Sequence, residues 1–115
     1  MALDLYAGIP VDDFPSALTW YEKLFGFPAS FVASDTEAVW DLAEHRSVFI
    51  CQRPTHAGRG MLNIVVDDLD AAVARIAAAG IRPTKRETYD NGVRKATYHD
   101  PEGNEVGFGG APLLG

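Results

Sequence analysis

The chain has 115 residues, of which 47% are hydrophobic and 23% charged, and its formal net charge is −6 at pH 7. This length fits one domain over residues 1–115, since compact domains peak at about 100–150 residues. The acidic balance argues against nucleic acid as a partner, because binding there depends on Lys and Arg that neutralise phosphates. No apolar run reaches the roughly 18 residues of a membrane helix, and no signal peptide is visible. We therefore expect a cytoplasmic protein with no membrane partner.

The charge is distributed unevenly along the chain. Residues 1–45 hold eight acids and one base, whereas residues 46–115 hold eight acids and nine bases. Five of these bases gather between the predicted second helix and the last strands: Arg82, Lys85, Arg86, Arg94 and Lys95. The basic segment is either a solvated hairpin that faces the acidic half of a second subunit or a rim that attracts anions.

Two copies of one pattern organise the chain. Residues 8–18 align with residues 63–73 at an offset of 55 (63 − 8), and each copy contains an Asp-Asp pair before a helical pattern. Repeats of this length are typical of duplicated supersecondary units. We therefore predict a first repeat over about 3–52 and a second repeat over about 60–109.

Each repeat predicts a strand, a helix and three further strands. The carboxylates of the Asp-Asp pairs can cap the first helical turn, and Gly26 and Gly80 can end the helices in a left-handed conformation. This repeated capping context favours a structural role for the Asp pairs over metal binding. The predicted strands cover residues 3–11, 28–34, 38–43 and 46–52, then 60–66, 81–89, 92–99 and 104–109. The resulting class is α+β, with one helix on one face of each four-stranded sheet and the opposite faces lining a cleft.

The motifs together resemble the vicinal oxygen chelate superfamily, which includes glyoxalases, extradiol dioxygenases and bleomycin resistance proteins. The resemblance rests on the two Val-Asp-Asp helix starts, on the segment Trp-Tyr-Glu-Lys-Leu-Phe-Gly-Phe at 20–27, and on Gly-Val-Arg at 92–94 before the turn 100–104. It covers residues 5–109 and implies a glyoxalase-like fold, a curved mixed sheet with a cleft and helices on the outer face. It does not fix the chemistry, because the superfamily spans several reactions and some proteins that are not enzymes.

Metal-dependent members of this superfamily carry His and carboxylate ligands on the first, fourth, fifth and eighth strands. Three of these positions fall on Tyr6, Met61 and Gly107, and the fourth falls on Ile50, or on Gln52 if the register differs by one pair. Hard divalent ions prefer carboxylate and imidazole donors, and only Tyr6 offers even a weak substitute. The resemblance therefore implies no metal site and no cofactor, and it is closest to the metal-free bleomycin resistance proteins.

The remaining cleft-side residues predict a binding pocket. Aromatic, thioether and small side chains with a few polar groups are typical of ligand sites. The candidate ligand-binding residues are Tyr6, Trp40 (or its neighbour Asp41), Ile50, Met61, Asn63, Lys95, Thr97, His99 and Gly107. We expect a metal-independent homodimer that binds a small, partly apolar or aromatic molecule, such as an antibiotic or another natural product. The competing interpretation is that Tyr6 and Met61 only fill a core between the sheets.

A diverged lyase, isomerase or dioxygenase of the same superfamily is the alternative function. A metal-free enzyme would use His99 or Glu105 as its base, because both lie on predicted neighbouring strands that flank one turn. A polar surface pair is the simpler interpretation of these two residues. A third hypothesis is an interaction subunit with an empty cleft. The sequence leaves open whether the two repeats pair within one chain or by exchange between two chains.

Overall fold

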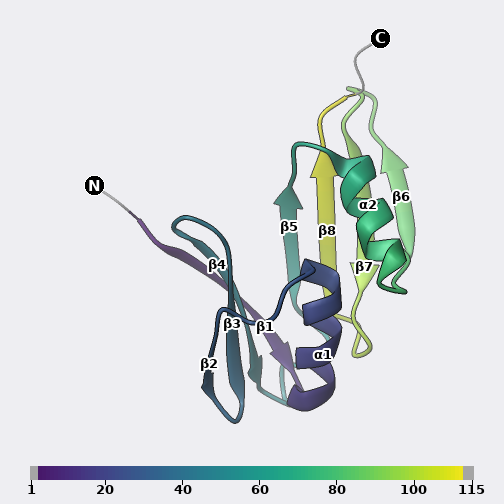
Figure 1. Ribbon diagram of the computed structural model, residues 1–115. Coiled ribbons are helices and arrows are strands. Elements are labelled where there is room, and N and C mark those ends of the chain that lie inside the picture. Colours follow the sequence, from purple (N-terminus) through teal and green to yellow (C-terminus); the bar gives the residue numbers. More distant parts are fainter. Residues whose placement is uncertain (1–2, 113–115) are drawn as a thin grey trace.

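The computed structural model describes residues 3–112 and contains two βαβββ units (Figure 1). The first unit consists of β1 (Leu5–Val11), α1 (Phe14–Phe25), β2 (Phe31–Ser34), β3 (Glu37–Ala43) and β4 (Arg46–Gln52). The second unit consists of β5 (Met61–Val65), α2 (Leu69–Ala78), β6 (Lys85–Thr88), β7 (Arg94–His99) and β8 (Glu105–Gly110). The predicted α+β class is confirmed. Neither α1 nor α2 is long and apolar enough to cross a membrane.

Each unit forms its own four-stranded mixed sheet. The strand order is β1-β4-β3-β2 in the first sheet and β5-β8-β7-β6 in the second. In both sheets the first strand pairs in parallel with the last, and a parallel pair requires a crossover such as the one that contains the helix. Over residues 3–112 no strand of one sheet pairs with a strand of the other, so β1 and β5 are edge strands. Figure 1 shows the two sheets at an angle, with α1 near their junction and α2 over the second sheet.

The helix starts follow the sequence signals. The Asp13 carboxylate accepts a hydrogen bond from the Ser16 N–H at 3.1 Å, and Asp68 accepts one from the Ala71 N–H at 3.0 Å. The second residue of each Asp pair therefore satisfies a free donor of the first helical turn. At the other end of α1, Gly26 has φ of 85°, a left-handed conformation that glycine adopts without steric cost.

Two edge strands are shorter than the sequence predicts. β2 begins at Phe31 and β6 at Lys85, although the predicted strands began at residues 28 and 81. Each missing stretch contains a proline, Pro28 or Pro83. Proline has no N–H to donate to a ladder, so regular pairing starts only after it.

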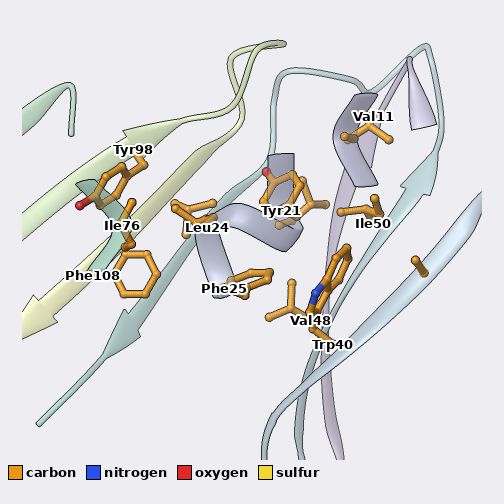
Figure 2. Packing of buried hydrophobic residues seen from close by; sticks show 14 of the residues in the cluster. Val11, Tyr21, Leu24, Phe25, Trp40, Val48, Ile50, Ile76, Tyr98 and Phe108 are labelled. Atoms are coloured by element: carbon orange, nitrogen blue, oxygen red, sulfur yellow. The ribbon is translucent and has the colours of Figure 1, made fainter. Parts of the chain in front are cut away.

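The core lies between the helices and the sheets. The ring centroids of Tyr21 and Phe25 on α1 lie 6.3 Å and 5.6 Å from that of Trp40 on β3. Figure 2 shows Leu24 of α1 between these residues and Ile76 of the second unit. Full burial of a large apolar side chain contributes about 1.5–3 kcal/mol. Helix α1 therefore stabilises its own sheet and also joins the two units.

A polar network at the turn 100–104 fixes the two units to each other. The Tyr21 hydroxyl donates to the buried Asp100 carboxylate at 2.8 Å, and the Asn104 side-chain amide donates to the Pro10 carbonyl at 2.8 Å. The Glu102 carboxylate accepts from two backbone N–H groups just before α1, at 2.6 Å and 2.9 Å. Burial raises the pKa of Tyr21 far above its usual value, and the Asp100 charge raises it further. The phenol therefore stays protonated and remains a donor across this joint.

Candidate functional site

Each sheet turns one face toward the helices and leaves the other face open. Side chains alternate along a strand, so the buried positions of β1, β4 and β8, carried to the other strands by register, identify the face that the helix covers. On the open faces Val39 and Thr97 are nevertheless only 4% exposed. The first open face contains Tyr6, Gly8, Pro10, Phe31, Glu37, Val39, Asp41, Ser47, Phe49 and Cys51. The second open face contains Met61, Asn63, Val65, Lys85, Glu87, Lys95, Thr97, His99, Glu105, Gly107 and Gly109.

The second open face brings together most of the predicted site. Strand register places its residues in three rows across β5, β8 and β7. The rows are Met61–Glu105–His99, Asn63–Gly107–Thr97 and Val65–Gly109–Lys95. All six ligand-binding candidates of the second repeat, and the candidate base Glu105, therefore share one surface.

Gly107 has no side chain, so two neighbouring side chains can approach each other above it at the centre of this surface. A Cβ atom at this position would collide with Oδ1 of Asn63 and would lie 2.6 Å from Cε of Lys95. The side chains of Asn63 and Lys95 therefore meet over the glycine, one from each neighbouring strand. Their polar ends lie together in the middle of the face.

A histidine and a carboxylate lie side by side in the first row. Nε2 of His99 is 3.6 Å from Oε1 of Glu105, while Nδ1 of His99 is 2.6 Å from Oγ1 of Thr84. The His–Glu distance is within ion-pair range but longer than a hydrogen bond. Both side chains are partly exposed, so a ligand hydroxyl or a proton can reach them.

The first open face is aromatic. Tyr6 and Phe31 are more than half exposed, and the Phe49 ring lies over Gly8, where a Cβ would be 2.6 Å from Cζ of the ring. The polar part of this face includes Asp41, whose carboxylate accepts a hydrogen bond from the Ser47 hydroxyl at 2.7 Å. This surface offers flat contact area, with a carboxylate beside it.

Two predicted ligand-binding residues lie on the helix side of the first sheet instead. Trp40 is 0% exposed and donates from Nε1 to the Phe27 carbonyl at 3.0 Å, and Ile50 is also 0% exposed. Their assignment to the ligand site was wrong, because an error of one residue along a strand moves a side chain to the opposite face. Asp41 and Phe49 take the open-face positions.

The strand pairing, combined with the repeat, identifies Phe49. Gly8 in the first repeat corresponds to Asn63 in the second, at the offset of 55 (63 − 8). Asn63 pairs with Gly107, and Gly8 pairs with Phe49. Because Gly8 is the equivalent of Asn63, its partner Phe49 is the equivalent of Gly107. Phe49, and not Ile50, is therefore the fourth-strand position.

A groove of about 450 Å³ lies between the two sheets, mostly on their helix side. It is lined by apolar residues that include Leu5 and Val48 of the first unit and Leu62 of the second. Of the predicted ligand-binding residues, only Asn63 lines it. Tyr6 and Met61 lie outside the groove.

The residues at the four positions of the superfamily's metal ligands do not fit a divalent ion. With the corrected fourth position, they offer a phenol (Tyr6), a phenyl ring (Phe49), a thioether (Met61) and no side chain at all (Gly107). Carboxylates suit hard ions such as Mg²⁺ and Mn²⁺, and imidazoles suit Zn²⁺, Fe²⁺ and Ni²⁺. Within residues 3–112, no three His, Cys, Asp or Glu side chains gather in a way that could hold a metal ion.

Comparison with known families agrees with the motifs and the topology. The sequence model of the Glyoxalase/Bleomycin resistance protein/Dioxygenase superfamily matches residues 3–108. The chain belongs to this superfamily. The resemblance inferred from the sequence motifs is thereby confirmed. Comparison with curated proteins gave no match.

Solved structures of the superfamily share the fold. A glyoxalase/bleomycin resistance protein from Catenulispora acidiphila is 48% identical, with a TM-score of 0.93, and the match covers 96% of this chain and 100% of that chain. TnmS3, an antibiotic binding protein from a Streptomyces species, is 24% identical with a TM-score of 0.76 over 98% of both chains. A bleomycin-binding protein complexed with bleomycin is 20% identical with a TM-score of 0.78, over 96% of this chain and 99% of that chain. The last two likenesses show the fold alone.

Proposed function

We propose that this protein binds a small, partly aromatic molecule without a metal ion, and that a second copy of the chain completes the site. The observation that carries the proposal is the set of residues at the superfamily's metal positions. Tyr6, Phe49 and Met61 replace ionic donors with apolar contact area, and Gly107 supplies no donor at all. Such groups suit a planar ligand, since aromatic and thioether side chains bind rings through large, polarisable surfaces.

Two structural relatives support a binding role. The bleomycin-binding protein holds bleomycin, and TnmS3 is an antibiotic binding protein. These proteins share the fold of this chain at 20% and 24% identity. They support the proposal that the same scaffold here holds a natural product of low molecular weight, including antibiotics.

The single chain exposes much of the surface that a ligand would need. Met61 and Val65 are 72% and 82% exposed, and Tyr6 is 55% exposed. The first open face carries Glu37 and Asp41 but no base, whereas the second carries Lys95. A second copy that sets the first open face of one subunit opposite the second open face of the other would cover the apolar groups and join unlike charges.

A thermal-shift screen with aromatic natural products tests the binding proposal. We expect at least one compound to raise Tm, and we expect Tyr6→Ala and Met61→Ala to abolish that rise while leaving the fold intact. Val32→Ala is the control, because Val32 is also exposed but lies on the helix side of edge strand β2. A Tm rise that persists in Tyr6→Ala, or one tightly held divalent ion per chain by metal analysis, would contradict the proposal.

The dimer is tested separately by sedimentation. Val65→Asp should weaken self-association at least tenfold, about 1.4 kcal/mol, because it adds a charge to a covered apolar surface. Val32→Asp places the same charge on an exposed valine outside both open faces and should leave association unchanged. Equal association of the two variants would contradict the proposed interface.

The His99–Glu105 pair favours a second candidate, a diverged metal-free lyase or isomerase. Its imidazole is positioned by Thr84 and lies 3.6 Å from a carboxylate, an arrangement that can accept a proton from a bound ligand. A compound found in the thermal-shift screen would then be converted. Loss of that turnover in His99→Ala, with binding retained, would support this candidate.

A further inference from the structure

Within the part of the chain that the structure describes, Lys95 lacks the carboxylate partner that Lys85 has on the same open face. Nζ of Lys85 lies 3.5 Å from Glu87, and Nε2 of His99 lies 3.6 Å from Glu105. Among residues 3–112, no carboxylate lies within ion-pair distance of Lys95. Lys95 is nonetheless partly buried. A partly desolvated ammonium without a nearby anion is unfavourable, so an anion that binds at this position would be stabilised.

The sheet holds this ammonium near the centre of the face and not at its edge. Lys95 starts in the third row, but its side chain leans over Gly107 in the second row. Nζ lies 3.4 Å from the point where a Cβ on residue 107 would be, and Oδ1 of Asn63 reaches the same point from β5. The absence of a side chain at Gly107 is therefore what allows the two polar groups to meet.

The carboxylate that faces Lys95 in the sheet is paired with another cation. Glu87 lies opposite Lys95 on β6, but its carboxylate pairs with Nζ of Lys85 at 3.5 Å. An anion placed against the ends of the Lys95 and Asn63 side chains would meet the ammonium directly, and the Asn63 side chain could turn its NH₂ group toward the same oxygen. Hydrogen bonds between an ammonium and an oxyanion are shorter and stronger than neutral ones.

We propose that Lys95 and Asn63 form an anion subsite that receives a carboxylate or phenolate oxygen of the ligand. This inference rests on the proposed function and narrows it from aromatic molecules in general to aromatic acids. Met61 lies beside the subsite and supplies apolar contact for the ring that bears the anion. Of the basic segment, only Lys85 and Lys95 lie on this face, whereas Arg94 pairs with Asp70 of α2 at 2.8 Å. The anion-attracting interpretation of that segment therefore narrows to Lys95.

The test is calorimetric titration with naphthoate and naphthamide, which share a ring system and differ in charge. Wild-type protein should bind naphthoate about tenfold more tightly, in line with the strength of hydrogen bonds to charged groups. Lys95→Met keeps most of the stem and removes the charge, so it should abolish this preference while naphthamide affinity stays unchanged. Lys95→Arg should retain the preference. The control is Lys23→Met, which removes the same charge from the last turn of helix α1, outside both open faces, and should keep the preference.

Three results would overturn the subsite. Equal affinity of wild-type protein for both compounds would leave aromatic binding intact and contradict the anion specificity alone. Failure of both compounds to bind at millimolar concentration would contradict the subsite and also count against aromatic binding. An unchanged naphthoate preference in Lys95→Met, accompanied by weaker dimerisation, would assign the ammonium to Glu37 or Asp41 of the partner subunit.

Discussion

The two repeats share their strand order and helix caps, but they differ in the side chains on the open faces of their sheets. The open face is aromatic in the first repeat and polar in the second. In both, the first strand pairs in parallel with the last, and an Asp caps the helix between them. In the first repeat the glycine of the central pair is Gly8, and Phe49 lies over it. In the second repeat the glycine is Gly107, and Asn63 lies over it together with Lys95. Each repeat thus has a glycine in its central strand pair, on β1 in the first and on β8 in the second. The side chains around this glycine are aromatic in the first repeat and polar in the second.

The repeats also differ in how their helices are packed. Helix α1 buries five side chains. Tyr21 and Phe25 pack against Trp40, while Leu24 and the Tyr21 hydroxyl reach the second unit. Helix α2 buries only Leu69 and Ile76 and is rich in alanine. The first repeat therefore holds the bulk of the aromatic core, and the second repeat is stabilised partly by contact with α1.

The largest loss of stability is expected for a substitution in the aromatic core of the first repeat. Trp40→Ala should lower the free energy of unfolding by about 3–5 kcal/mol, because it leaves a large cavity beneath α1. Urea denaturation measures the loss. Trp20→Ala is the control, since the Trp20 ring also touches Tyr21, with centroids 4.8 Å apart, but is only partly buried. An equal loss in both variants would contradict the view that the core is concentrated between α1 and β3.

The two central glycines offer a direct test of the chemical difference between the faces. Gly8→Ala should cost about 1–3 kcal/mol, because its Cβ meets the stiff Phe49 ring at 2.6 Å and overpacking forces the ring to move. Gly107→Ala should cost less, since the flexible end of Lys95 can turn away, but it should also lower naphthoate affinity.

Gly109→Ala is the control for both glycine variants. Its Cβ would lie 3.7 Å from the nearest atom, Cγ2 of Val65, which is ordinary van der Waals contact. Urea denaturation should therefore find Gly109→Ala the least affected of the three. A larger loss at Gly107 than at Gly8 would mean that Lys95 is held more rigidly than its chemistry suggests.

The fold could be predicted from the sequence because the motifs that determine it are local and occur in both repeats. The Asp-Asp pairs, Gly26 and the offset of 55 (63 − 8) fixed the helix starts, one helix end and the order of elements. The shortened edge strands were harder, although Pro28 and Pro83 already argued against regular pairing there. Which strand edges stay unpaired is set by packing over the whole chain, and no local motif encodes it.

The face of the sheet on which each candidate residue lies was predictable in the second repeat and less so in the first. Met61, Asn63 and Gly107 were placed correctly on one face because alternation along β5 and β8 is uninterrupted. Trp40 and Ile50 were misplaced because apolar residues occupy both faces of β3 and β4, so hydrophobicity alone cannot choose between the two registers. Only the pairing of Gly8 with Phe49 resolves the choice.

The smallest predicted effect concerns the joint between the repeats. Tyr21→Phe should cost about 1.5 kcal/mol at neutral pH, because it removes a hydrogen bond to the Asp100 carboxylate. The variant keeps the ring and its packing against Trp40. It therefore separates the polar joint from the aromatic core of the first repeat.

The stability of Tyr21→Phe should also depend on pH differently from that of wild-type protein. Burial raises the pKa of Tyr21 in the folded protein above the value of 10.0 that an exposed tyrosine has. Above about pH 10 the unfolded chain loses this proton while the folded chain keeps it, so the unfolded state binds fewer protons and stability falls as pH rises. Tyr98, whose pKa burial also raises, contributes a slope of the same sign. Urea midpoints above about pH 10 should therefore fall less steeply in Tyr21→Phe than in wild-type protein. Identical slopes in the two proteins would show that the Tyr21 phenol ionises in the folded state and that the joint is open to solvent.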